Sequence, residues 1–407
     1  MKFIDGGVTS AKGFSAANCN AKIKYMNRDD MAMIYADVPC DVAGTFTKNV
    51  VKAAPVLWDK KVCVEEKKAQ AVVINAGIAN ACTGEEGFSY CKQTADKCAE
   101  VLPVDPKQVL VASTGVIGMQ LPMDCIKNGI DMMAKSLSSD RVAGENASKA
   151  IMTTDTKNKE VCVQVEIGGK TITIGGMSKG SGMIHPNMCT MLAFLTTDAN
   201  ISSEMLQEAL SFVVEDTYNM ISVDGDTSTN DTCVVLASGL AENERITEKD
   251  KDYEAFKEAL FEANKTLAMK MAGDGEGATA LFEVKVEEAR SKEEAKILAK
   301  SVVTSSLTKA AIYGHDANWG RILCALGYSG VDFDPEQVDL YFESKEGLLQ
   351  IAAKGVSTGY SEEEATKILS CDHVTAICKM HQGNACATAW GCDLTHEYVS
   401  INADYRS

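Results

Sequence analysis

Short apolar runs that end at polar or turn residues predict strands in the first third of the chain, at 31–36, 70–75 and 109–113. Apolar residues that recur at helical spacing predict helices at 85–101, 202–219, 250–271 and 291–311. A further strand over 280–289 comes directly before the last of these helices. The pattern is therefore that of a mixed α and β protein.

Turn and capping residues define the limits of several elements. Gly168 and Gly169 separate the alternating segments VCVQVEI and KTITIGG, and they supply the positive φ angles that a two-residue hairpin turn requires. Two pairs have the capping-box spacing that begins a helix, Ser291 with Glu294 and Ser361 with Glu364. We therefore expect a hairpin in the middle of the chain and two helices with well-defined starts.

The fold class follows from this mixture of elements. Strands, helices and a hairpin together indicate an α/β, or α+β layered, architecture with largely antiparallel sheets, and not a doubly wound nucleotide fold. A chain of 407 residues exceeds what one hydrophobic core usually supports, so we expect two domains. The strand at 280–289 and the helix after it place the boundary between 1–281 and 282–407.

Composition narrows the possible partners and the compartment. The net charge of −17 disfavours nucleic acid and anionic membranes, and it mildly favours a cationic metabolite. The chain has no run of eighteen apolar residues and no signal-peptide pattern, so a cytoplasmic location is expected. Its 15 cysteines are odd in number and contain no C-x-x-C pair, which predicts reduced thiols and not a disulfide scaffold.

A single threonine is the strongest candidate for chemistry. In the segment KGSGMIHPNMCTMLAFLTTDA, Gly180, Gly182 and Pro186 oppose a regular helix, so an irregular loop leads to Thr190 at the start of a strand. A threonine hydroxyl needs an adjacent base, and cutting the bond between Cys189 and Thr190 would supply one as the new α-amine. The alternative is a plain buried loop before a core strand.

Two glycine-containing turns are further candidates. The strand that ends at Ser113-Thr114-Gly115 runs into a turn whose backbone N–H groups can face an oxyanion, although a plain strand-to-loop turn fits equally well. The stretch 273–279 cannot cradle a phosphate, because Asp274 and Glu276 would repel it. A carboxylate there suits an ammonium group, and a helix end with solvated acids is the alternative.

Three other stretches have weaker signals. The loop 224–231 resembles the start of a calcium loop, but its sixth position is Thr229 and its twelfth is Val235, so a polar loop near the site is expected. The segment 176–180 matches G-x-S-x-G but no helix follows, which disfavours a serine hydrolase. The final segment EYVSINADYRS predicts a docked terminus, where Asn402 and Ser407 are candidates for ligand contact.

Taken in order, these stretches resemble the ornithine acetyltransferase family, also called the glutamate N-acetyltransferase or bifunctional arginine-biosynthesis acetyltransferase family. The likeness runs nearly end to end, and an ordered set of this size is far more specific than any single piece. It rests on GGVTSAKGFSAANCNAKIK, FTKNVVKAAPVLW, INAGIANACTGEEG, VASTGVIG, IMTTDT, GGMSKGSGMIHPNMCTML, SVDGDTSTND, GDGEGAT, GHDANWGRI and AWGCDLTHEYVSINADYRS.

The resemblance implies a self-processing enzyme of the N-terminal-nucleophile type. Its catalytic domain would be an αββα-type sandwich, followed by a smaller C-terminal α/β domain whose tail returns to the active site. The precursor would cut itself between Cys189 and Thr190, and the α and β chains would assemble as α2β2 or a higher oligomer.

The resemblance also implies the reaction. Thr190 would take the acetyl group of N2-acetyl-L-ornithine and pass it to L-glutamate by a ping-pong mechanism, in arginine biosynthesis and without a metal or cofactor. Thr114 and Gly115 would form the oxyanion hole, and substrate contacts would fall to Thr153, Lys179, Thr190, Glu276, Asn402 and Ser407.

Some alternatives stay open at this point. Acetyl-CoA as a second acetyl donor is not decided by the sequence. A self-processing aminopeptidase or amidase of related fold, which passes the acyl group to water, is the nearest rival. An amino-acid-binding regulatory protein with an intact chain is the non-enzymatic one.

This sequence departs from the family pattern at two positions. Cys189 stands where alanine is common before the nucleophile, and its small side chain is compatible with cleavage although its thiol is a competing nucleophile. Ile78 stands where asparagine is frequent, which leaves the details of that turn open.

Overall fold

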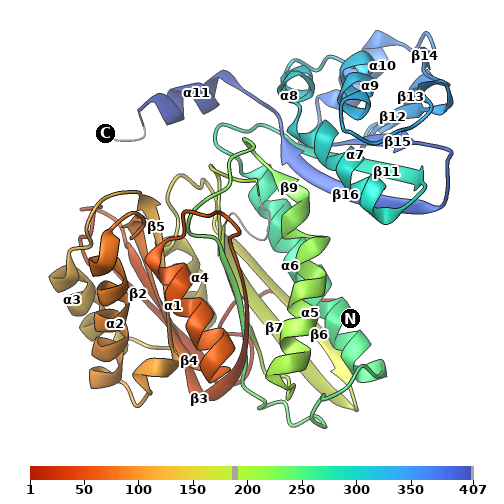
Figure 1. Cartoon of the computed structure of the whole chain (residues 1–407). Coiled ribbons are helices and arrows are strands. Elements are labelled where there is room, and N and C mark those ends of the chain that lie inside the picture. Colours follow the sequence, from red (N-terminus) through yellow and green to blue (C-terminus); the bar gives the residue numbers. More distant parts are fainter. Residues whose placement is uncertain (186–190, 405–407) are drawn as a thin grey trace. The chain divides into compact units, whose positions relative to one another are not determined.

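The structure is a computed structural model that describes residues 1–185 and 191–404. The described residues divide into two compact units (Figure 1). The first unit contains 1–180, 191–219 and 227–267, and the second contains 181–185, 220–226 and 268–404. The chain therefore enters the second unit twice before it completes the first. A division into folding domains at 281–282 stays a prediction.

The first unit is built on one mixed sheet of nine strands. Its order is β1-β6-β7-β8-β10-β3-β4-β5, with β2 paired to β3. The pairs β4–β5 and β8–β10 are parallel and the other pairs are antiparallel, as the sequence predicted for the sheets as a whole. The strands are β1 (Lys2–Phe3), β2 (Phe14–Cys19), β3 (Met31–Phe46), β4 (Lys68–Ile78), β5 (Val109–Val116), β6 (Lys159–Ile167), β7 (Lys170–Lys179), β8 (Leu192–Thr197) and β10 (Thr232–Ala237).

Both faces of this sheet are buried, and alternate residues of each strand point to opposite faces. Met33 and Val73 join a core cluster with α2 and α3, whereas Ile34 and Ile74 join a second cluster that includes α4. Helices α2 and α3 therefore cover one face of β3 and β4, whereas the cluster on the opposite face also includes residues of β7, β8 and β10. The helices are α1 (Ala54–Lys61), α2 (Gly84–Val101), α3 (Met123–Ala134), α4 (Arg141–Ala150), α5 (Ser203–Glu215) and α6 (Lys251–Gly273), with short turns at Val62–Glu66, Pro106–Gln108 and Tyr218–Met220.

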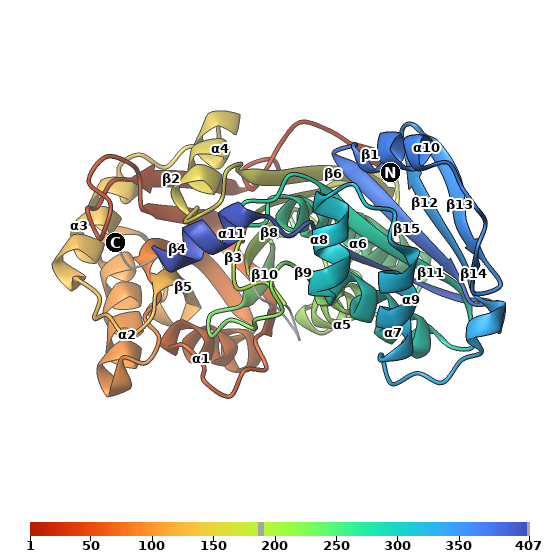
Figure 2. The ribbon, with the colours of Figure 1, turned by 90° about the horizontal axis from the view of Figure 1, so that it is seen from above.

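The second unit has its own mixed sheet, in the order β14-β13-β12-β15-β11-β16-β9. Helix α7 packs on β11 and β16, with α8 and α9 beside it (Figure 2). The elements are β9 (Ile221–Ser222), β11 (Leu281–Ala289), β12 (Asp339–Ser344), β13 (Gly347–Ala353), β14 (Val356–Ser357), β15 (His373–Lys379), β16 (Ala385–Cys392), α7 (Lys292–Thr304), α8 (Ser306–Tyr313), α9 (Trp319–Gly327), α10 (Glu362–Leu369), α11 (His396–Ala403) and a short turn at Pro335–Gln337.

Most predicted elements are confirmed. The strands at 31–36, 70–75 and 109–113 lie within β3, β4 and β5, the strand at 280–289 matches β11 except at its first residue, and β6 and β7 form the predicted hairpin. Gly168 and Gly169 have φ angles of +57° and +77° at its turn. The hydroxyls of Ser291 and Ser361 accept the backbone N–H groups of Glu294 and Glu364, as capping boxes should.

The predicted helix at 291–311 is wrong, because the chain breaks there into α7 and α8. Ser305 leaves the helical conformation with ψ of 110°, and its hydroxyl accepts the N–H of Thr308 at 3.3 Å. A serine that satisfies the free N–H groups of a new helix stabilises this break. The predicted helix at 202–219 also ends earlier, at Glu215, and a short turn follows.

The described residues agree with the composition-based predictions on cysteines and on membrane-spanning helices. Fourteen cysteines are described, and all of them carry free thiols. None of the described helices combines the length and the apolar character that crossing a bilayer requires. Ten of the described cysteines are buried and contribute to the core as small apolar side chains and not as cross-links.

One acid of α1, Asp59, lies in the core of the first unit. Its side chain is fully buried, and one carboxyl oxygen accepts the N–H of Val111 at 2.8 Å. The other oxygen has no hydrogen-bond partner in the described part of the chain. Burial raises the pKa of Asp59 well above its usual range.

We predict that Asp59→Asn stabilises the protein, and more so at higher pH. A carboxyl group whose pKa is raised by folding lowers the free energy of unfolding as the pH rises above its unfolded pKa of about 4, by up to about 1.4 kcal/mol per pH unit. The free energy of unfolding in urea should therefore favour the variant more at pH 7 than at pH 4.5. The same substitution at the half-exposed Asp96 is the control, and an equal gain at both pH values would contradict the assignment.

Candidate active site

Lys179 at the end of β7 brings three of the predicted site residues together. Its ammonium group donates to the hydroxyl of Thr153 at 2.8 Å and lies 3.4 Å from the hydroxyl of Thr114. Only 7% of Lys179 is exposed, so these hydroxyls replace water around a buried positive charge. Neighbouring strands position the lysine, since Lys179 pairs with Leu192 of β8.

The predicted oxyanion turn requires glycine for steric reasons. Gly77 of β4 faces Gly115 of β5, and their φ angles of +107° and +130° suit glycine alone. A Cβ atom on Gly115 would lie 2.2 Å from the carbonyl carbon of Gly77. The two backbones are therefore in contact, and Thr114 and Gly115 remain partly exposed at the end of β5.

The side chains of Asn230 and Ser113 fix this turn through buried hydrogen bonds. The amide of Asn230 donates to the backbone carbonyls of Ala79 and Ser113, at 2.5 and 2.8 Å. The Ser113 hydroxyl in turn donates to Asn75 at 2.7 Å. These buried bonds hold Thr114 between fixed neighbours. Ile78, where the family pattern left the turn open, is buried in the core below it.

Two buried acids near Lys179 were missed by the sequence analysis. The carboxylate of Asp155 accepts Lys159 Nζ and the N–H of Gly180, both at 2.7 Å. Asp231, just before β10, is 1% exposed, and burial raises its pKa well above its usual range although the charge of Lys179 opposes this. The signal for Asp155 was Lys159 four residues later, whereas Asp231 ends the loop 224–231 that was expected near the site without being singled out itself.

In the second unit, Glu276 and Asn402 form the pair that the prediction placed at the ligand. Asn402 Nδ2 donates to Glu276 Oε2 at 2.7 Å, and Glu276 is only 5% exposed. Gly182 makes room for this carboxylate, because a Cβ atom there would lie 2.4 Å from it. The alternative interpretation of Asp274 and Glu276 as solvated acids is therefore wrong.

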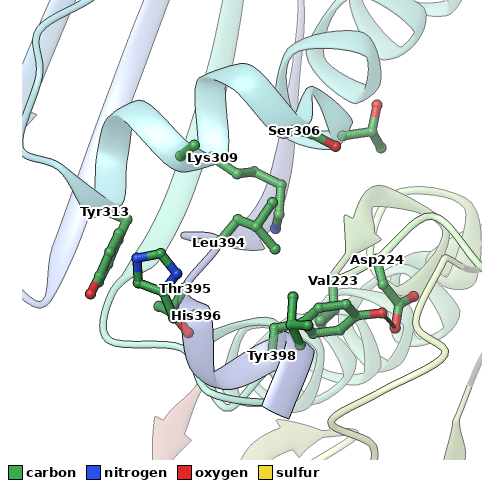
Figure 3. Close-up of a pocket in the computed structure, with 12 residues that line it drawn as sticks. Val223, Asp224, Ser306, Lys309, Tyr313, Leu394, Thr395, His396 and Tyr398 are labelled. Atoms are coloured by element: carbon green, nitrogen blue, oxygen red, sulfur yellow. Dashed lines mark hydrogen bonds between the residues drawn. The ribbon is translucent and has the colours of Figure 1, made fainter. Parts of the chain in front are cut away.

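Asp224 lines a cavity in the second unit. Asp224 accepts the N–H groups of Met183 and Ile184 at 2.6 and 2.9 Å, and the Tyr398 hydroxyl lies 3.3 Å from it. Figure 3 shows Tyr398 and Asp224 on one side of this cavity of about 550 Å³, with Lys309 reaching in from α8. Within the described residues no group of ligands could hold a metal ion.

The G-x-S-x-G segment at 176–180 is not a nucleophile elbow. Ser178 lies inside β7, pairs with Lys159 and Ala193 on the two sides, and is fully buried. A serine in the middle of a three-stranded ladder cannot stand at the exposed turn that an elbow requires. The disfavoured serine-hydrolase interpretation is therefore excluded.

Three predicted residues, Cys189, Thr190 and Ser407, lie outside the described residues. The structure thus places Thr114, Gly115, Thr153 and Lys179 in the first unit, and Glu276 and Asn402 in the second. The catalytic and binding roles of all these residues stay predictions.

Comparison with known proteins identifies the family. A model of the ArgJ family matches residues 15–407. The arginine biosynthesis bifunctional protein ArgJ of Thermotoga neapolitana is 49% identical over 397 residues, which are 97% of this chain and 99% of that protein. Its namesake from Caldanaerobacter subterraneus subsp. tengcongensis is 48% identical over 407 residues, the whole of both chains.

A solved structure agrees with this. The crystal structure of the arginine biosynthesis bifunctional protein argJ from Bacillus halodurans matches with 51% identity and a TM-score of 0.50, and the match covers 52% of this chain and 97% of that chain. This chain belongs to the ArgJ family.

We predict that Asn230→Ala loosens the turn that carries Thr114 and Gly115. Two buried carbonyls would lose their donor, which typically costs about 1–3 kcal/mol of stability. Urea unfolding should show this loss, and hydrogen exchange should become faster in the peptides that contain the turn. Asn128→Ala on the exposed face of α3 is the control. Unchanged exchange at the turn would show that Asn230 does not hold it.

Proposed function

We propose that this protein transfers the acetyl group of N2-acetyl-L-ornithine to L-glutamate and so forms L-ornithine and N-acetyl-L-glutamate. The observation that carries the proposal is the buried ammonium group of Lys179 against Thr114 and Thr153, beside a glycine turn with partly exposed backbone. Membership of a family whose curated relatives are named arginine biosynthesis bifunctional proteins supports it.

The nucleophile in this proposal is Thr190, released by scission of the bond to Cys189. The Thr190 hydroxyl attacks the Cys189 carbonyl, an ester replaces the peptide bond, and water hydrolyses that ester. The freed α-amine has a reference pKa of about 7.7–8.0, so it can act as a base near neutral pH. The crystal chain from Bacillus halodurans matches 52% of this chain, close to the share that 190–407 make up, which supports a two-chain product.

The transfer proceeds through an acetyl ester. The Thr190 oxygen attacks the acetyl carbonyl, and N–H groups at Thr114 and Gly115 stabilise the negative charge that develops on its oxygen. The amide C–N bond breaks and ornithine leaves with the proton that the α-amine accepted. Glutamate then attacks the ester with its amino group, which restores the Thr190 hydroxyl.

Charge decides which molecules fit. Donor and acceptor share an α-carboxylate, so the ammonium group of Lys179 can anchor each in turn. Glu276, held by Asn402, is a buried carboxylate suited to the side-chain ammonium of ornithine. No metal or cofactor is needed for these steps, since an ester and an amide are exchanged without oxidation.

The remaining parts of the proposal concern the cell. The chain would act in the cytoplasm in arginine biosynthesis, as α and β chains assembled into α2β2 or a higher oligomer. The word bifunctional in the names of the relatives makes acetyl-CoA the second donor to test, for direct synthesis of N-acetylglutamate.

We predict that Thr190→Ala yields one uncut chain without activity, because the hydroxyl is needed for both scission and transfer. Denaturing electrophoresis should show two bands for the natural protein and one for the variant. Terminal sequencing of the larger product, residues 190–407, should read Thr-Met-Leu-Ala-Phe. Cys189→Ala is the control and should still be cut, and a natural protein that stays whole would refute the proposed scission.

We also predict ping-pong kinetics. After quenching with N-acetylornithine alone, mass spectrometry should find one added acetyl group on Thr190, and double-reciprocal plots for the two substrates should be parallel. Acetyl-CoA in place of N-acetylornithine tests the second donor in the same assay. Release of acetate to water at the full rate without glutamate would instead indicate an amidase.

A further inference from the structure

Asp155 connects three parts of the first unit through one carboxylate. Oδ1 accepts Lys159 Nζ and the Gly180 N–H, both at 2.7 Å, and Oδ2 accepts the Thr153 N–H at 3.0 Å. The side chain is fully removed from solvent. The loop before β6, the start of β6 and the end of β7 therefore meet at this group.

Asp155 lies between two buried ammonium groups and contacts each of them differently. Lys159 is 1% exposed and donates directly to Oδ1, whereas Lys179 Nζ lies 3.8 Å from Oδ2 and donates to Thr153 instead. Burial raises the pKa of Asp155, but Lys179, Lys159 and the Gly180 N–H outweigh it, so the pKa falls well below its usual range. Asp155 is ionised at any working pH.

The charges of Asp155, Lys159 and Lys179 do not cancel. Two ammonium groups and one carboxylate leave a net charge of one positive unit among them. Burial raises the pKa of Asp231 well above its usual range, which disfavours a second negative charge here. Lys159 makes the closer contact with Asp155, whereas the ammonium group of Lys179 lies 3.4 Å from the hydroxyl of Thr114.

The contacts of Asp155 also fix the direction in which the Lys179 side chain points. Asp155 binds the backbone N–H of Gly180, directly after Lys179, and the N–H of Thr153, whose hydroxyl accepts Lys179. Asp155 therefore fixes both the backbone next to Lys179 and the threonine that accepts its ammonium group. A shift of Asp155 would move the ammonium group and its acceptor together.

From this geometry we infer that Asp155 is a positioning residue, which aims the ammonium group of Lys179 at the acetyl-transfer site while Lys159 neutralises the carboxylate. The inference rests on the proposed function for its kinetic consequence. It assigns a role to Asp155 and Lys159, two residues to which the proposed function gives no substrate contact.

The decisive variant replaces both members of the close pair, as Asp155→Asn with Lys159→Met. It removes one charge of each sign and preserves shape, so it should fold where Asp155→Asn alone leaves two buried ammonium groups facing each other. We expect kcat to fall about 10- to 100-fold, because misplacement by about 1 Å has effects of this size. A crystal structure should show that Lys179 Nζ has left Thr153 Oγ1.

The matched control is Glu145→Gln, which breaks an equivalent i,i+4 pair with Lys149 on the surface of α4. It should leave kcat, thermal stability and the position of Lys179 unchanged. Together with the double variant, it separates loss of an ion pair in general from loss of the buried carboxylate that Lys179 faces.

Three results would overturn the inference. Activity of the double variant within about threefold of the natural protein would mean that Asp155 only balances charge, and an unmoved Lys179 would exclude positioning. Failure of both Asp155 variants to fold would make the residue purely structural. If the natural protein transfers no acetyl group, the proposed function fails, whereas the crystal structures still decide whether Asp155 positions Lys179.

Discussion

A lysine ammonium group that is almost entirely removed from water has to be given partners, and this requirement organises the first unit. Lys179 ends β7 inside a sheet whose two faces are both covered, so solvent cannot supply those partners. The hydroxyls of Thr153 and Thr114 and the carboxylate of Asp155 supply them instead. The loop that contains Thr153 and Asp155 and the end of β5 are thereby fixed beside the end of β7.

Regular elements were predictable because their patterns are local. Alternation and apolar runs were enough for β3, β4 and β5, and two adjacent glycines were enough for the hairpin of β6 and β7. The break between α7 and α8 was not predictable, because the spacing of apolar residues continues through Ser305. Whether such a serine interrupts a helix depends on what the next turn packs against.

The site was predictable only where its residues belong to distinctive motifs. Thr114 and Gly115 stand at the end of a predicted strand, and Lys179 stands at the end of a predicted hairpin. Strands β5 and β7 are not neighbours in the sheet, so strand order does not explain why these residues meet. Single acids carry no such pattern. Glu276 was found in a glycine-rich stretch, but its burial depends on Gly182, a residue from a distant part of the chain.

The division of the chain into units also exceeds what a pattern can reveal. Strand β9 contains only Ile221 and Ser222, too few residues for any periodicity, yet it closes the edge of the second sheet beside β16. The segment 181–185 joins the same unit through bonds such as Val223 N–H to the Ile184 carbonyl. Pairings of this kind are made by position in space and leave no trace in composition.

The Glu276 carboxylate occupies space that is free only because residue 182 is glycine, since even one methyl group there would overlap it. These two positions therefore cannot vary independently. A library that enlarges residue 182 would recover folded members mainly where residue 276 is shortened at the same time, and shortening it would withdraw the partner of Asn402. Attempts to reshape this site for other ligands have to treat the pair as one unit of design.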